Sequence, residues 1–157
     1  MNDITPCLWF DTDGEEAARF YISVFPDSKI LEISRYGEAG PRDAGTVMTV
    51  DFELDGQRFL ALNGGPEFTF SEAISFQVSC RDQGEVDAYW SKLSAGGEEG
   101  PCGWLKDRFG VSWQIVPTAL PELLGSPDPE TSQRVMQAML KMKKIEIGEL
   151  ERAAAAA

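Results

Sequence analysis

The chain has 157 residues and a formal net charge of −12, and it contains no histidine. A chain of this length forms one domain, or two small half-domains that share a core. Nucleic acids and anionic membranes both require basic side chains against their phosphates, so the acidic composition argues against either partner.

The cysteines, Cys7, Cys80 and Cys102, are widely spaced and form no CxxC pair. This pattern favours reduced thiols in a cytoplasmic protein over a disulfide framework. The chain does not start with a basic segment followed by an apolar one, and no apolar run approaches about 18 residues. The sequence thus predicts neither a signal peptide nor a membrane span.

The first part of the chain, residues 3–64, has the pattern of a β-α-β-β-β module. Apolar residues alternate over 4–10, and a helix is predicted from Asp13, a plausible N-cap, to the stop at Pro26. Further strands are predicted over 29–36, 46–53 and 58–63, with an Asp-Gly turn between the last two.

The second part, residues 72–117, repeats this order of elements. The patterns predict a strand over 73–80, a helix over 83–93, a short strand near Gly100–Cys102 and a hairpin over 103–117. The two helices share their spacing of acidic and aromatic residues at a constant offset. This favours duplication of one module over a coincidence between two amphipathic helices.

The closing hairpin has one strongly apolar face. Val111, Trp113 and Ile115 alternate with polar residues, so Trp113 is predicted to face the helical layer. Gln114 points the opposite way from a strand whose two faces both look partly buried, so a partner or ligand should satisfy its amide. A core hairpin with an incidental glutamine is an equally good interpretation.

The last part of the chain, residues 118–157, is here called the tail. Asp128, Pro129 and Glu130 form a helix start, with a capping aspartate and a proline at the first helical position. The helix that follows carries an apolar stripe made of Val135, Met136, Met139, Leu140 and Met142. Packing in the core or against another subunit explains such a stripe better than a ligand groove does.

Two motifs connect the chain to a known superfamily. The first is Glu-Glu-Ala-Ala-Arg-Phe-Tyr at 15–21 with Phe-Pro-Asp-Ser at 25–28, and the second is Gly-Trp at 103–104 with Asp-Arg-Phe-Gly-Val-Ser-Trp at 107–113. With the paired modules, they resemble the PhnB-like branch of the glyoxalase/bleomycin-resistance superfamily, also called vicinal oxygen chelate proteins. The resemblance implies an α+β fold in which two βαβββ modules form curved mixed sheets around a cleft, with a helical tail, in a single domain.

Catalytic members of this superfamily hold a divalent metal with histidines on the first strand of each module and a glutamate on the last. The equivalent cleft-facing places here are Thr5 or Cys7, Ala73 or Ser75, and Gln114. Without imidazole, and with a neutral amide in place of the carboxylate, we expect no metal and no cofactor. Cys7 also lacks a histidine base, so an inert thiol is a better interpretation than a nucleophile.

The resemblance leaves two classes of function. The first is a protein that binds a small organic molecule in a cleft lined by Cys7, Trp9, Asn63, Gln77, Trp104 and Gln114. Aromatic walls with a few polar groups are typical of such clefts, although a packed core tryptophan is a slightly better interpretation of both Trp9 and Trp104.

The second class is an enzyme that transforms a small organic substrate. Lys106 or Asp107 would supply its ionisable group, and no catalytic residue is assigned. Its reaction would be that of a lyase, or of the 3-demethylubiquinone-9 3-methyltransferase after which branch members are often labelled. However, the chain shows no strand followed by a Gly-rich loop suited to S-adenosylmethionine. A homodimer is expected in either class, because the superfamily pairs its modules and the tail stripe offers apolar surface.

Overall fold

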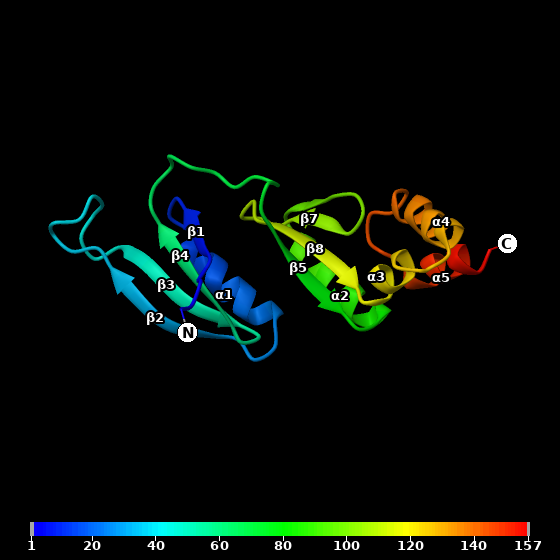
Figure 1. Cartoon of the computed structure of the whole chain (residues 1–157). Coiled ribbons are helices and arrows are strands. Elements are labelled where there is room, and N and C mark those ends of the chain that lie inside the picture. Colours follow the sequence, from blue (N-terminus) through cyan, green and yellow to red (C-terminus); the bar gives the residue numbers. More distant parts are fainter. Residues whose placement is uncertain (1, 157) are drawn as a thin grey trace. The chain divides into compact units, whose positions relative to one another are not determined.

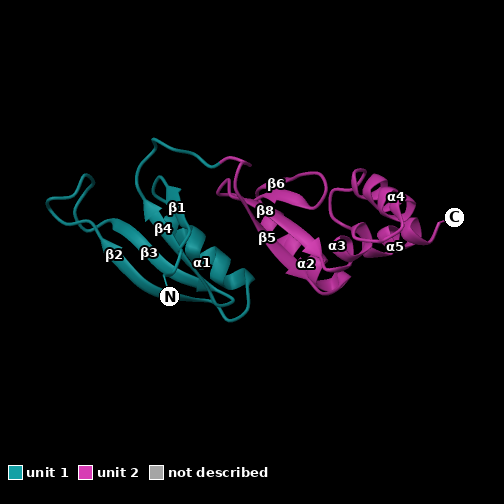
Figure 2. Cartoon of the chain, viewed as in Figure 1, with its two compact units in different colours: residues 1–70 teal, residues 71–157 magenta. Residues whose placement is uncertain are grey.

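The computed structural model of the chain describes residues 2–156 and has an α+β fold, as predicted. The chain divides into two compact units, residues 1–70 and residues 71–157 (Figure 2). The predicted module 3–64 lies within the first unit, and the module 72–117 lies with the tail in the second. That all 157 residues form a single domain stays a prediction.

The first unit is a four-stranded mixed sheet with one helix across it (Figure 1). Its elements are β1 (Cys7–Phe10), α1 (Gly14–Val24), β2 (Lys29–Arg35), β3 (Val47–Leu54) and β4 (Gln57–Asn63). The strand order is β1-β4-β3-β2, and only the β1–β4 pair is parallel. The helix buries Tyr21 completely, with its ring stacked on that of Phe52 from β3.

The second unit repeats this sheet and adds the tail. Its module consists of β5 (Ser75–Cys80), α2 (Gln83–Ser94), β6 (Glu98–Glu99), β7 (Trp104–Lys106) and β8 (Ser112–Pro117). The strand order is β5-β8-β7-β6, again with a parallel pair at one edge and antiparallel pairs elsewhere. The identical order in both sheets confirms the predicted βαβββ repeat.

The strand predicted near Gly100–Cys102 is wrong by a few residues, because those positions form a turn. Pro101 has no amide hydrogen for a ladder, and its carbonyl accepts a hydrogen bond from Trp104 N at 3.0 Å. Cys102 has a φ of 57° and Gly103 a φ of 85°, which ends the extended conformation. The strand therefore lies earlier in the chain, at β6.

The hairpin β7–β8 has the faces expected from its alternation. Trp113 is 3% exposed and Ile115 is fully buried, while Gln114 between them is half-buried on the opposite side. The prediction that Trp113 belongs to the helix-covered face is confirmed. Its indole nitrogen donates to Asp107 Oδ2 at 2.9 Å, so the ring is also fixed by a buried carboxylate.

The start of α1 is capped differently from the prediction. Asp13 makes no side-chain cap bond, and the amide of Gly14 instead donates to Asn63 Oδ1 at 2.8 Å. A Cβ on Gly14 would lie 2.6 Å from that oxygen, so only glycine permits this approach. The end of β4 thus satisfies one of the free amides of the first helical turn.

The tail folds into α3 (Ala119–Leu124), α4 (Pro129–Met139) and α5 (Ile147–Ala155) around a small apolar core. Val135 is fully buried there and Met139 packs against the core, so much of the predicted stripe is covered within its own unit. Met136 and Leu140 are 40% and 60% exposed. The homodimer stays a prediction. No helix in residues 2–156 is long and apolar enough to cross a membrane.

Candidate functional site

The face of the second sheet opposite α2, here called the open face, carries two polar rows across the strands. Register pairs Ser112 of β8 with Ser75 and Lys106, and it pairs Gln114 with Gln77 and Trp104. Paired residues on neighbouring strands project to the same side of a sheet. The open face therefore brings together the three predicted residues of this unit, Gln77, Trp104 and Gln114.

The amide of Gln114 has a protein partner within this face. Its Nε2 donates to Ser75 Oγ at 2.8 Å, which links the two rows diagonally. Gln77 next to it is exposed. The expectation that the Gln114 amide needs a partner is thus met in part by a neighbouring strand, and the bond orients the glutamine along the sheet.

A cavity of about 420 Å³ opens beside these rows and is floored by β7 and β8. Its lining residues are Glu72, Glu98, Glu99, Gly100, Pro101, Trp104, Leu105, Lys106 and Ser112. Ser112 is 2% exposed, and no described residue bonds its hydroxyl oxygen. A buried hydroxyl without a partner is destabilising by about 1–3 kcal/mol.

An ion pair between Lys106 and Glu72 lies at this cavity. The hydrogen bond from Lys106 lowers the pKa of Glu72 below its ordinary value, and Glu72 in turn raises the pKa of Lys106. Both groups are therefore charged at neutral pH. A lysine whose pKa is raised is a poor general base, which weakens the role proposed for Lys106 in catalysis.

Asp107, the other group considered for catalysis, is 3% exposed and serves the β7–β8 turn. Its Oδ1 accepts the amides of Phe109 at 2.8 Å and Val111 at 3.1 Å, and its Oδ2 accepts the Trp113 indole. A buried carboxylate that accepts three hydrogen bonds from its own hairpin is a structural group. The structure thus contradicts the idea that Asp107 is the ionisable group of a cleft.

The open side of the first sheet holds Cys7 and Trp9, as predicted from strand alternation. Cys7 is an exposed residue, yet burial of its thiol raises the pKa above the ordinary cysteine value, so the nucleophilic thiolate is disfavoured. The Trp9 indole donates to the Gly65 carbonyl at 2.9 Å, and Phe68 packs edge-on against the ring at 5.0 Å. Trp9 is thus half-covered by its own chain.

Asn63 differs in placement from the expectation, because it lies on the helix-covered side of its sheet. It is 6% exposed, its oxygen accepts from Gly14, and its Nδ2 donates to the Val47 carbonyl at 3.2 Å. It also touches a separate cavity of about 740 Å³ at Arg35 and Arg42, on the other side of the sheet from Cys7. Its amide acts in packing α1 onto the sheet.

The residues at the superfamily's metal-binding places do not fit a divalent cation. Gln114 supplies a neutral oxygen, Ser75 is a hydroxyl already bonded to Gln114, and the pKa of Cys7 is raised rather than lowered. Within residues 2–156, no three His, Cys, Asp or Glu side chains gather closely enough to hold a metal. The chemistry of these places therefore does not support a metal centre.

Sequence reasoning missed Ser112 and Glu72 as functional candidates. Ser112 shares its strand face with Gln114, and this alternation was a signal that could have placed it beside Trp104. No sequence pattern indicates that the Ser112 hydroxyl is buried without a hydrogen-bond partner, because this depends on which residues of other elements surround it. Glu72 precedes β5, and no local pattern indicates its pairing with Lys106.

Comparisons with known proteins agree with this fold. The sequence model of the 3-demethylubiquinone-9 3-methyltransferase family matches residues 2–116, which ends before the tail. A structure of the PhnB protein of Bacillus cereus, which carries the same methyltransferase label, is 38% identical, with a TM-score of 0.67 over 74% of this chain and 100% of that chain. A comparison with curated proteins found no match.

Two more distant structures support the fold alone. Protein PA1353 of Pseudomonas aeruginosa is 19% identical, with a TM-score of 0.62 over 74% of this chain and 98% of its own. The fosfomycin resistance protein FosX of Mesorhizobium loti is 14% identical, with a TM-score of 0.57 over 80% of this chain and 98% of its own. The chain belongs to the 3-demethylubiquinone-9 3-methyltransferase family, in its PhnB-like branch.

Proposed function

We propose that the second unit binds a small, uncharged or weakly polar organic molecule in the cavity on its open face, without a metal. The observation that carries this proposal is the buried, unpaired hydroxyl of Ser112 beside the half-exposed ring of Trp104. A ligand that stacks on the indole and hydrogen-bonds the hydroxyl would remove the cost of that unpaired group.

The charges around the cavity argue against an anionic ligand. Lys106 and Glu72 neutralise each other, and the remaining charges of the lining, Glu98 and Glu99, are both negative. The chain carries a net charge of −12, which repels anions at long range. A cavity of about 420 Å³ also falls within the size range of small-molecule sites, roughly 300–1,000 Å³.

Binding is favoured over catalysis because the two candidate ionisable groups are engaged elsewhere. Lys106 is held charged by Glu72, and Asp107 is buried in the β7–β8 turn, where it accepts the Trp113 indole. Acid–base chemistry needs a group that can change protonation near neutral pH. The methyltransferase label of the family and a lyase reaction are therefore the weaker proposals for this chain.

Ligand binding is tested directly with Nile red, an uncharged fluorescent dye whose carbonyl can accept from Ser112. The full chain should bind one dye, and Trp104→Ala should weaken this binding about tenfold or more through loss of the stacking ring. Native mass spectrometry of gently purified protein should also show a bound organic mass that is missing from Trp104→Ala. Dye binding that is equal in both proteins would place the ligand elsewhere.

Replacing Ser112 with alanine should separate binding from stability. The change removes a buried unpaired hydroxyl, so the free energy of unfolding should stay the same or rise by about 1 kcal/mol. Nile red affinity should fall by about two- to tenfold, the value of one hydrogen bond. Urea denaturation and dye titration measure the two effects.

The matched control is Ser75→Ala, because Ser75 accepts a bond from Gln114 in the same rows. This variant should lose about 1 kcal/mol of stability. Destabilisation of Ser112→Ala by as much as the control would mean that the Ser112 hydroxyl has a partner after all.

Metal titration provides a separate test of the metal-free site. Calorimetry with zinc, nickel, manganese and magnesium should show no tight stoichiometric binding, because the places of the usual ligands hold a thiol with a raised pKa and neutral polar groups. Gln114→Glu restores only one carboxylate and is expected to change little. Tight binding to the unaltered protein that Gln114→Ala abolishes would contradict the proposal.

A further inference from the structure

The turn at residues 100–103, here called the wall loop, joins the cavity to the tail. Gly100 and Pro101 line the cavity, and Trp104 follows the loop directly. On its other side, Cys102 N donates to the Met142 carbonyl and Gly103 N to the Lys143 carbonyl, both at 2.8 Å. The main chain of the tail therefore holds the wall loop by two hydrogen bonds, and the wall loop forms one wall of the cavity.

The wall loop has little freedom to take another shape while the tail is docked. A Cβ on Gly103 would lie 2.9 Å from the Ile115 carbonyl and 3.2 Å from Ile145 Cγ1. Ile145 is fully buried and comes from the tail segment that bonds the loop. The loop is thus held between β8 and the segment 142–147.

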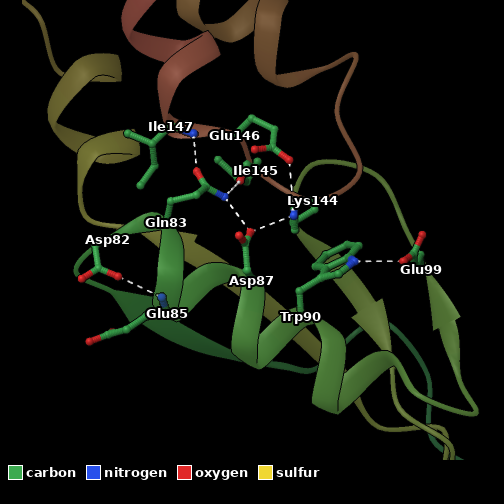
Figure 3. A network of polar contacts seen from close by, with 10 residues as sticks. All are labelled: Asp82, Gln83, Glu85, Asp87, Trp90, Glu99, Lys144, Ile145, Glu146 and Ile147. Atoms are coloured by element: carbon green, nitrogen blue, oxygen red, sulfur yellow. Dashed lines mark hydrogen bonds and ion pairs between the residues drawn. The ribbon is translucent and has the colours of Figure 1, made fainter.

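One side chain in the first turn of α2 makes hydrogen bonds to that segment (Figure 3). The Gln83 amide donates from Nε2 to the Ile145 carbonyl at 3.0 Å, and its Oε1 accepts from Ile147 N at 2.8 Å. Nε2 also lies 2.9 Å from Asp87 Oδ1, which pairs with Lys144 at 2.7 Å. One amide thereby holds two main-chain groups of the tail, more than 60 residues away in sequence.

We propose that Gln83 is a positioning residue: it docks the tail segment 142–147, which holds the wall loop and so keeps the cavity of the second unit in its binding shape. The part that concerns ligand rests on the proposed function. The family match covers residues 2–116, so the tail supplies this control from outside the matched module. It follows that the cavity should respond to a change on α2 that touches neither Trp104 nor Ser112.

Hydrogen–deuterium exchange of the full chain tests the docking without any ligand. Gln83→Ala should speed exchange of the Cys102 and Gly103 amides by about tenfold. The reason is that the tail segment that carries their acceptor carbonyls loses its two hydrogen bonds to Gln83. Gln83→Met keeps side-chain length without the bonds and should behave the same. Lys144→Ala removes only two surface ion pairs, to Asp87 and to Glu146, and should have a smaller effect.

The matched control is Gln133→Ala, a change on the exposed side of α4 in the same tail, and it should leave both amides unchanged. Unchanged exchange in Gln83→Ala and Gln83→Met would overturn the inference, whatever the protein binds.

Dye binding tests the consequence for the cavity. Nile red affinity should fall about threefold in Gln83→Ala, which corresponds to a wall loop that is assembled for most of the time in the unaltered protein and for about a third of the time in the variant. One outcome would overturn the control of the cavity and leave the proposed function standing. In that outcome, Trp104→Ala loses dye binding, whereas Gln83→Ala keeps full affinity although its wall loop exchanges fast. Absence of dye binding to the unaltered protein would instead overturn the proposed function, and exchange alone would then decide the docking.

Discussion

Trp113→Ala is expected to lower the free energy of unfolding by about 3–5 kcal/mol, the usual cost of emptying a buried aromatic site. The ring is 3% exposed and lies 5.5 Å from that of Phe76. The change also leaves Asp107 Oδ2 without its indole donor. Urea denaturation followed by circular dichroism measures the loss, and Trp113→Phe, which keeps most of the volume, should show a smaller one.

Trp104→Ala is the matched control, since it removes the same side chain from the neighbouring strand on the open face. Trp104 is half-buried, so its loss should cost much less stability while it impairs dye binding. Gln114→Ala should likewise cost only about 1 kcal/mol, the value of its bond to Ser75. Losses of equal size at positions 104 and 113 would mean that the assigned faces of β7 and β8 are wrong.

Asp107→Ala should destabilise the second unit by a similar amount, about 3–5 kcal/mol. The carboxylate accepts the amides of Phe109 and Val111 and the indole of Trp113, and all three donors would lose their partner at once. Asp107→Asn keeps an acceptor for the two amides but turns an NH₂ group or a weaker oxygen toward the indole, so an intermediate loss is expected. Thermal and urea unfolding measure both variants.

Asp43→Ala is the control for this prediction, because Asp43 also lies in a turn but is exposed. Its substitution should change stability by less than about 0.5 kcal/mol. Wild-type stability in Asp107→Ala would show that the three donors find other partners, and would return Asp107 to the set of groups free for chemistry.

Most of the fold could be predicted from the alternation of apolar and polar side chains along the sequence. Trp113 between Val111 and Ile115 set the faces of the last strand, and the repeated helix spacing indicated two modules. The wall loop was misjudged because a positive φ at Cys102 has no local signal in a residue that is not glycine. For Asn63 the signal was present: it shares strand parity with Phe59 and Ala61, both buried under α1.

The candidate site depended on contacts that periodicity does not encode. The Ser112 hydroxyl lacks a partner only because the surrounding elements cover it and offer no acceptor or donor. Gln83 meets Ile145 and Ile147 across more than 60 residues, a pairing that no window of the sequence reveals. Tertiary packing decides such groups, so their roles required the structure.

The parallel pairing of first and last strands sets an order of events during synthesis. β1 pairs only with β4, so it cannot join the sheet until the chain has been synthesised as far as Asn63 and has left the ribosome. At that point all strands of the first sheet are present. β5 likewise waits for β8, at Pro117. Each sheet closes over a span of fewer than 60 residues within its own unit. All four strands of the first unit are thus available for pairing while the second unit is still being translated.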